Sequence, residues 1–147
     1  MDELLSNRVL LTSLVALLLA QAIKVVLVFL TDRRVAFDRL LETGGMPSSH
    51  SAAVTSLMVG LGLSYGWGSP YVAIAVVFGV IVMYDATGIR RAAGMHAQMI
   101  NELVEELTHL FDEGFQPQIL KTLLGHTYPQ VLAGAVLGIV TALVIFL

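Results

Sequence analysis

The sequence predicts an all-α integral membrane protein, a bundle of about four transmembrane helices with one amphipathic helix on the cytoplasmic side. Hydrophobic residues make up 56% of the 147 residues and charged residues 13%, about half the charged share of an ordinary soluble domain. Mean hydropathy is +0.82. These values exclude a soluble helical bundle, a disordered chain and a basic nucleic-acid-binding module. The length suits a single membrane-embedded domain over residues 1–147.

Four apolar stretches are long enough to cross a hydrocarbon core, which takes ~20 helical residues. They run over about 9–30, 47–65, 71–84 and 130–147. The first carries one charge, Lys24, and the third ends at Asp85. Residues 66–70 (Gly-Trp-Gly-Ser-Pro) are typical of a tight turn, so they predict a hairpin between the second and third spans.

Between the third and fourth spans, apolar residues recur on one face of a predicted α-helix. They are Ile100, Leu103, Val104, Leu107, Leu110 and Phe111. The opposite face is acidic, which suits water better than anionic lipid, so this helix is expected to pack on the bundle or on a partner subunit. Gly114 and Pro117 are predicted to end it.

The basic residues predict the orientation in the membrane. They lie in the loops after the first and third spans, at Arg33, Arg34, Arg39, Arg90, Arg91 and Lys121, whereas the 66–70 hairpin has none. The positive-inside rule therefore places both basic loops in the cytoplasm and both chain termini outside, in a cell (inner) membrane.

This topology brings several chemically reactive or charged residues to the cytoplasmic face. They are Lys24, His50, Asp85, Arg90, Arg91 and His126. Two histidines, three cations and a carboxylate at one level of a small bundle are typical of an anion-binding site.

The segment Pro47-Ser48-Ser49-His50 begins the second span. Ser48 or Ser49 can cap the helix, and the free N–H groups and the macrodipole of a helix N-terminus favour a phosphate. The alternative is a capped helix start with an incidental histidine. Lys24 is either a phosphate ligand or a lysine that snorkels to the headgroups. Arg90 and Arg91 are either phosphate ligands or positive-inside anchors.

His126 lies at a predicted junction between a loop and a helix, where a histidine can attack phosphorus. Gln130, one helical turn later, can hydrogen-bond the other ring nitrogen. An interfacial histidine is the alternative. The sequence has no cysteine and no His-x-x-x-His pair, so we expect neither a metal nor a cofactor. Gly134 and Gly138 form a small-xxx-small pair suited to close helix packing, and a homodimer is a further expectation from it.

These motifs carry a family resemblance. Pro47-Ser48-Ser49-His50 and the segment around Gly125-His126 resemble the second and third signatures of the type-2 phosphatidic acid phosphatases, relatives of the vanadium haloperoxidases. Residues 44–51 (Gly-Gly-Met-Pro-Ser-Ser-His-Ser) and 84–94 (Tyr-Asp-Ala-Thr-Gly-Ile-Arg-Arg-Ala-Ala-Gly) are more similar to the divergent branch of that superfamily. The resemblance covers nearly the whole chain.

The resemblance implies metal-independent hydrolysis of a phosphomonoester at a membrane face. By position, His126 is the expected nucleophile, His50 the general acid and Lys24 a phosphate ligand. The arginines of the superfamily's first and third signatures are replaced by Thr31 and Leu120. We therefore expect Arg90 and Arg91 to hold the phosphate.

The carboxylate that follows the nucleophilic histidine in the superfamily is replaced here by Gln130. Asp85 is the only acid at the membrane end of a predicted span on the same face, so one hypothesis gives it the missing role. The alternative is that Asp85 pairs with Arg90 or Arg91.

Two functions follow from these expectations. The first is a phosphatase of a lipid phosphate or polyprenyl phosphate that acts through a phosphohistidine intermediate. The second is a non-enzymatic carrier, sensor or assembly subunit that binds the same phosphorylated lipid. In both, the expected partners are the phosphorylated lipid and the surrounding membrane lipids, with no nucleic acid.

Overall fold

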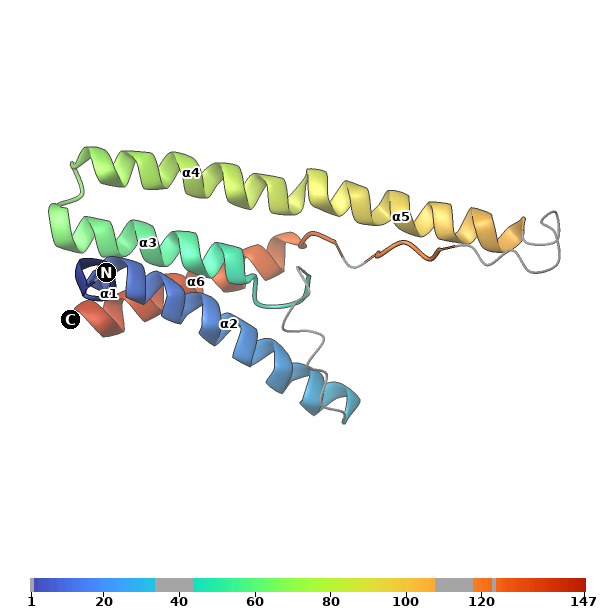
Figure 1. The fold of residues 1–147 in the computed structure, drawn as a ribbon, viewed down its shortest axis with the longest axis horizontal. Coiled ribbons are helices and arrows are strands. Elements are labelled where there is room, and N and C mark those ends of the chain that lie inside the picture. The colour runs from blue at the N-terminus through green and yellow to red at the C-terminus, as the bar shows by residue number, and fades with distance from the viewer. Residues whose placement is uncertain (1, 34–43, 108–117, 123) are drawn as a thin grey trace.

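The computed structural model describes residues 2–33, 44–107, 118–122 and 124–147, and in these residues all regular structure is helical. The elements are α1 (Asp2–Leu5), α2 (Arg8–Asp32), α3 (Ser49–Tyr65), α4 (Pro70–Thr87), α5 (Ile89–Glu106) and α6 (Tyr128–Phe146). The all-α prediction is confirmed, and each predicted span corresponds to one of the helices α2, α3, α4 and α6. Figure 1 shows these helices side by side, with α5 continuing α4 beyond the bundle.

Helix α3 lies at the centre of the bundle, in contact with α2, α4 and α6. Small side chains permit this close packing. A Cβ added to Gly134 would lie 2.2 Å from the Ser48 carbonyl oxygen, and one added to Gly138 would lie 2.1 Å from Thr55 Oγ1. The predicted small-residue pair is therefore used within the chain, between α6 and α3. It is covered there, so a homodimer would need a different surface.

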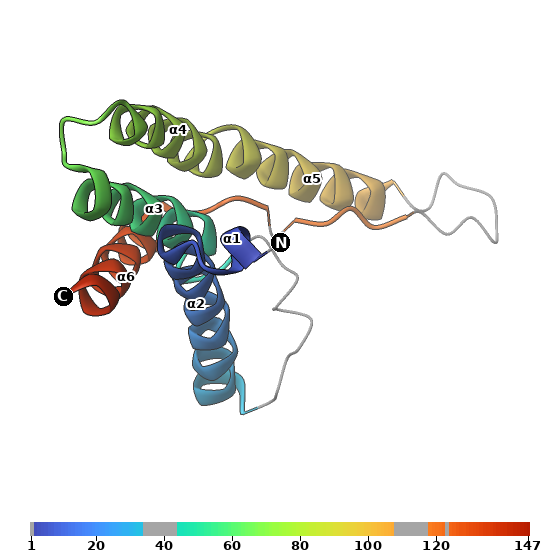
Figure 2. The ribbon, with the colours of Figure 1, turned by 60° about the vertical axis from the view of Figure 1, so that its left-hand side comes forward.

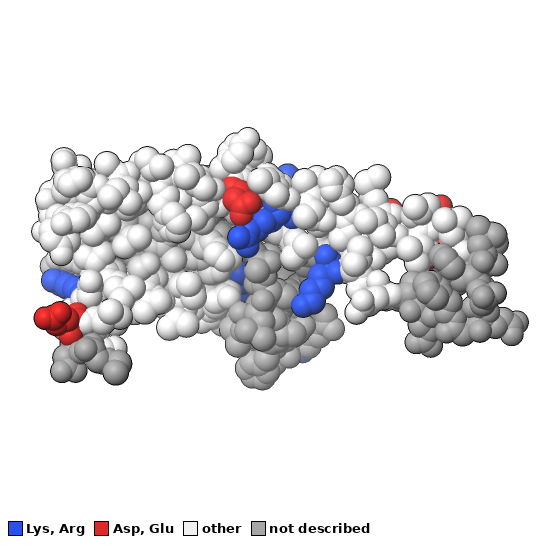
Figure 3. Space-filling model, turned by 45° about the horizontal axis from the view of Figure 1, so that its top comes forward, with Lys and Arg blue, Asp and Glu red and all other residues white. Residues whose placement is uncertain are grey.

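In the part of the chain that the structure describes, three helical stretches are long and apolar enough to cross a membrane: α2, the continuous rod of α4 and α5, and α6. Helix α3 has 17 residues, which lies at the lower limit of the ~17–25 residues that a span needs. In the space-filling view of Figure 3, an uncharged surface separates a few charged side chains at one end of the bundle from a group of basic side chains, with acidic atoms beside them, at the other. This belt is the expected surface of a bilayer-embedded bundle.

The two ends of the bundle are built differently. At one end, the Arg8 guanidinium donates to the Ile145 carbonyl and lies 4.5 Å above the Phe146 ring, which joins the start of α2 to the end of α6. The α3–α4 hairpin turns at this end too, at Gly66 with φ +85°. The opposite end contains the start of α3, the end of α4 and the start of α6. Figure 2 shows α2 diverging from the other helices towards it.

Helix α5 begins eleven residues before the predicted amphipathic stretch, at Ile89 rather than Ile100. Ile100 and Leu103 are 48% and 54% exposed, so this face does not pack on the bundle, and its packing on a partner subunit stays a prediction. The described chain instead returns along the opposite face of α5, where the Asn101 side chain makes two 2.9 Å hydrogen bonds with the Leu120 backbone. The predicted helix end at Gly114 and Pro117 lies outside the described residues.

Candidate functional site

His126 is held by its backbone against the junction of α4 and α5. Its N–H donates to the Ala86 carbonyl at 2.8 Å. The preceding residue, Gly125, has φ +76°, and a Cβ there would lie 2.4 Å from the Arg91 backbone nitrogen. Only glycine fits such a close approach in the left-handed region. The start of α5 therefore fixes the position of His126.

The His126 side chain is 2% exposed, and its Nδ1 lies 3.3 Å from Gln130 Oε1. The same oxygen accepts a hydrogen bond from the Thr127 N–H at 3.0 Å, so the amide presents its oxygen, not its NH₂ group, to the ring. An oxygen can only accept a hydrogen bond, so Nδ1 carries the proton and Nε2 carries the lone pair. Nε2 is buried and makes no hydrogen bond of ordinary geometry to a described residue, although the Gly45 carbonyl is near enough to favour the protonated ring. This is the tautomer that a nucleophile requires.

Burial also sets the charge of His126. Removal of the imidazolium from water lowers the pKa of His126 below its ordinary value of 6.5, and the Gln130 oxygen and the Gly45 carbonyl oppose this effect only in part. The ring is therefore neutral at pH 7.

His50, the second residue of α3, faces His126. The two rings are 6.3 Å apart between centroids and inclined by 61°. The start of α3 is tied to the start of α6 by a 3.0 Å bond from the Ser48 N–H to the Gln130 carbonyl. The Ser48 hydroxyl also accepts from the Ser51 N–H, so the predicted cap is Ser48. Ser49, the other candidate, is buried beside it at 4% exposure.

Lys24 enters the same end from α2. It is 4% exposed, and a Cβ added to Gly45 would lie 3.8 Å from its Cδ. Its charge acts on both the His50 and the His126 rings. A lysine so deeply buried does not snorkel to the headgroups, so the structure places Lys24 with the two histidines.

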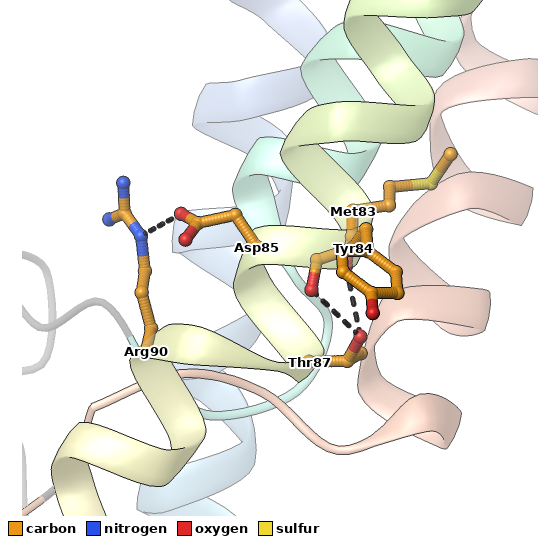
Figure 4. Close-up of polar contacts among 5 residues, drawn as sticks. All are labelled: Met83, Tyr84, Asp85, Thr87 and Arg90. Carbon is orange, nitrogen blue, oxygen red and sulfur yellow. Dashed lines mark hydrogen bonds and ion pairs between the residues drawn. The ribbon is translucent and has the colours of Figure 1, made fainter.

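Asp85 lies against Arg90 and makes no hydrogen bond to His126. Its Oδ2 is 2.5 Å from Arg90 Nε across the junction of α4 and α5 (Figure 4). The pairing alternative is therefore the one observed. The group that contacts Nδ1 of His126 is Gln130. Both charges of the Asp85–Arg90 pair act on His50, which leaves Arg90 at the edge of the site.

A cavity opens beside His126. It is lined by Gly44, Gly45, Arg91, Thr122, Leu124, Gly125, His126, Thr127 and Gln130. Arg91 is thus a cavity residue, whereas Lys121, near the superfamily's arginine position, is exposed and does not line it. The wall that Thr122, Leu124 and Gly125 contribute was not predicted from the sequence, because none of these residues has a charged or titratable side chain. Among the described residues, no three His, Cys, Asp or Glu side chains gather as metal ligands would.

The protein is a helical membrane protein in which the buried His126, the half-buried His50 and several cations lie together at one end of the bundle. Residues 5–141 match the model of the Divergent PAP2 family, and the chain belongs to that family. It is similar to an uncharacterized membrane protein of Bacillus subtilis (strain 168), YuiD, with 43% identity over 152 residues, covering 97% of this chain and 96% of that protein. No solved structure matches the chain.

Proposed function

We propose that this protein is a membrane phosphatase that hydrolyses a lipid phosphate or polyprenyl phosphate through a phosphohistidine at the cytoplasmic face. The observation that carries the proposal is the pair of rings from His50 and His126, 6.3 Å apart. A group about to react lies about 3–3.5 Å from its nucleophile, so both rings can reach one phosphoryl group. The membrane location and the family support the lipid class of substrate.

In the proposed first step, His126 Nε2 forms a bond to phosphorus while the bond from phosphorus to the lipid oxygen breaks. Protonated His50 gives its proton to that oxygen, which leaves as the alcohol. In the second step, neutral His50 takes a proton from water as the water oxygen attacks phosphorus. Inorganic phosphate leaves and His126 is restored. Lys24 and Arg91 would stabilise the charge on the phosphate oxygens.

One observation favours the second function, a non-enzymatic protein that binds the same phosphorylated lipid. Among the described residues no carboxylate contacts His126, because Gln130 holds Nδ1 and Asp85 pairs with Arg90. A glutamine orients the ring, but it does not offset the positive charge of a phosphohistidine. Such a site could bind phosphate without turning it over.

Phosphate release by the purified protein separates these functions. We expect release from a polyprenyl phosphate or phosphatidic acid to persist in a chelator and to be inhibited by orthovanadate, which would occupy the cavity lined by His126 and Arg91. Activity abolished by the chelator and restored by magnesium would indicate another mechanism. Vanadate-sensitive lipid binding with no phosphate release would support the second function.

The orientation of the site is tested by labelling. The chain has no cysteine, so single cysteines report without background. Gly68→Cys lies in the α3–α4 hairpin with open space around its Cβ, and Gln98→Cys is exposed on α5. In intact cells, a membrane-impermeant maleimide should label Gly68→Cys, and Gln98→Cys only after permeabilisation. The reverse pattern would place the site on the outer face.

The pH dependence follows from the buried state of His126. Because burial lowers the pKa of His126 below 6.5, the nucleophile is neutral above that value and becomes protonated as pH falls. The acid limb of the kcat/KM profile should therefore lie below pH 6.5. Gln130→Glu puts a negative charge next to Nδ1, so the pKa and the acid limb should move upward, with turnover equal or higher. A wild-type limb above pH 7, or no movement in Gln130→Glu, would contradict this assignment.

A further inference from the structure

A second, largely apolar groove adjoins the cavity that contains His126. One wall is a face of α2 formed by Lys24, Leu27, Val28 and Thr31, at the i, i+3, i+4, i+7 spacing of a single helical face. The other wall is the turn of residues 44–46. The Thr31 hydroxyl donates to the Leu27 and Val28 carbonyls, so its one donor is used within its own helix.

The groove is continuous with the phosphate end of the site. Gly44 and Gly45 line both the groove and the cavity of His126. Lys24 lies at the groove's inner end, and its charge acts on both histidine rings. The buried Lys24 ammonium group therefore acts on the two histidines. From Lys24 the groove extends along α2 between apolar side chains.

The position of the groove in α2 indicates where it opens. Residues 25–30 of α2 are all apolar and belong to a helix able to span the membrane. Lys24 lies seven residues before Thr31, which is ~10 Å along a helix. The groove therefore runs for about this length beside helical residues that suit hydrocarbon.

We propose that this groove binds the hydrocarbon of the substrate next to its phosphate, so that the lipid enters from the bilayer along α2. The proposal rests on the proposed function and adds the residues that select a lipid over a water-soluble phosphate: Leu27, Val28 and Met46. The charge of Lys24 and the connection of the groove to the His126 cavity indicate the ligand. An anionic headgroup fits the end that contains Lys24, and an alkyl or prenyl chain fits the apolar walls. Phosphatidic acid and a polyprenyl phosphate share this chemistry.

The test fills the groove with a larger side chain. Leu27→Trp should lower the ratio of kcat/KM for a long-chain substrate to kcat/KM for glycerol 3-phosphate by at least ~10-fold, the effect of ~1.4 kcal/mol. Leu27 is 40% exposed, so the indole has room in the fold. The matched control is Val26→Trp, on the opposite side of α2 and 55% exposed, which should leave the ratio as in the wild type. Polyprenyl phosphate and phosphatidic acid are tested separately as the long-chain substrate. The lipid whose kcat/KM ratio falls more in Leu27→Trp is the one that the groove binds.

Equilibrium binding of the same two lipids is measured in parallel, because it does not depend on turnover. Weaker binding to Leu27→Trp than to Val26→Trp supports the groove even if no phosphate is released, in which case only the phosphatase function fails. Equal ratios and equal binding in the two variants would overturn the groove proposal while leaving a measured phosphatase activity intact.

Discussion

His126→Ala should lower kcat by at least ~10³-fold, with the helical bundle retained. The expected loss is large because the variant removes the atom that would bond to phosphorus. His126 is the last residue but one before α6. Its ring contacts His50 and Gln130 only at the first turns of α3 and α6, whereas the packing of these two helices continues through Gly134 and Gly138. The bundle should therefore keep its helical circular dichroism and its unfolding temperature.

Two further variants, His96→Ala and His50→Ala, show whether the loss in His126→Ala is specific to a nucleophile. His96→Ala removes an exposed histidine of α5 and should keep wild-type turnover. His50→Ala should lose ~10²–10⁴-fold on an alkyl phosphate, the usual contribution of a general acid. It should lose much less on p-nitrophenyl phosphate, whose leaving group needs no proton. If His126→Ala keeps turnover within twofold of the wild type, the nucleophile is another group and the mechanism is wrong.

The helices could be predicted from the sequence because hydropathy and turn residues determine them directly. Runs of apolar residues placed α2, α3, α4 and α6 within a few residues of their observed bounds. The alternating direction of four spans then brought Lys24, His50 and His126 to one end before any contact was known. This inference needed only a count of spans and no detail of side-chain packing.

The contacts within the site could not be predicted in the same way. The start of α5 was missed because Arg90, Arg91 and the small residues after them interrupt the apolar periodicity on which the prediction depended. The partner of Asp85 could not be predicted, because the sequence allows the carboxylate to contact either His126 or one of the two arginines. Only the geometry of the junction of α4 and α5 shows that the carboxylate meets Arg90.

The position of Gly125 links the junction of α4 and α5 to the proposed chemistry. Gly125 packs on the Arg91 backbone, and the next N–H bonds to Ala86 at the end of α4. Both contacts involve main-chain atoms, which do not move unless the helices move. His126 is therefore held by the junction itself, and Arg91 enters the cavity from the same turn of α5.

Gly125→Ala should therefore lower kcat/KM by at least ~10²-fold, the cost of displacing a reacting group by about 1 Å. The added Cβ would lie 2.4 Å from the Arg91 nitrogen and 2.7 Å from its Cα. In addition, alanine at φ +76° is strained, at a cost of about 1–3 kcal/mol. The His126 segment should move away from α5 and become more exposed. The pKa of His126 should then rise towards 6.5, which NMR titration of the imidazole measures.

Gly68→Ala is the matched control, since a Cβ there meets no atom within 4 Å and the hairpin lies at the other end of the bundle. It should leave kcat/KM, the His126 pKa and the unfolding temperature as in the wild type. Circular dichroism separates a displaced segment from a lost fold, because α3 and α6 pack on each other through Gly134 and Gly138 and not through Gly125. A Gly125→Ala protein with wild-type turnover and an unshifted His126 pKa would show that the junction does not position the nucleophile. The placement of catalysis at His126 would then lose its structural basis.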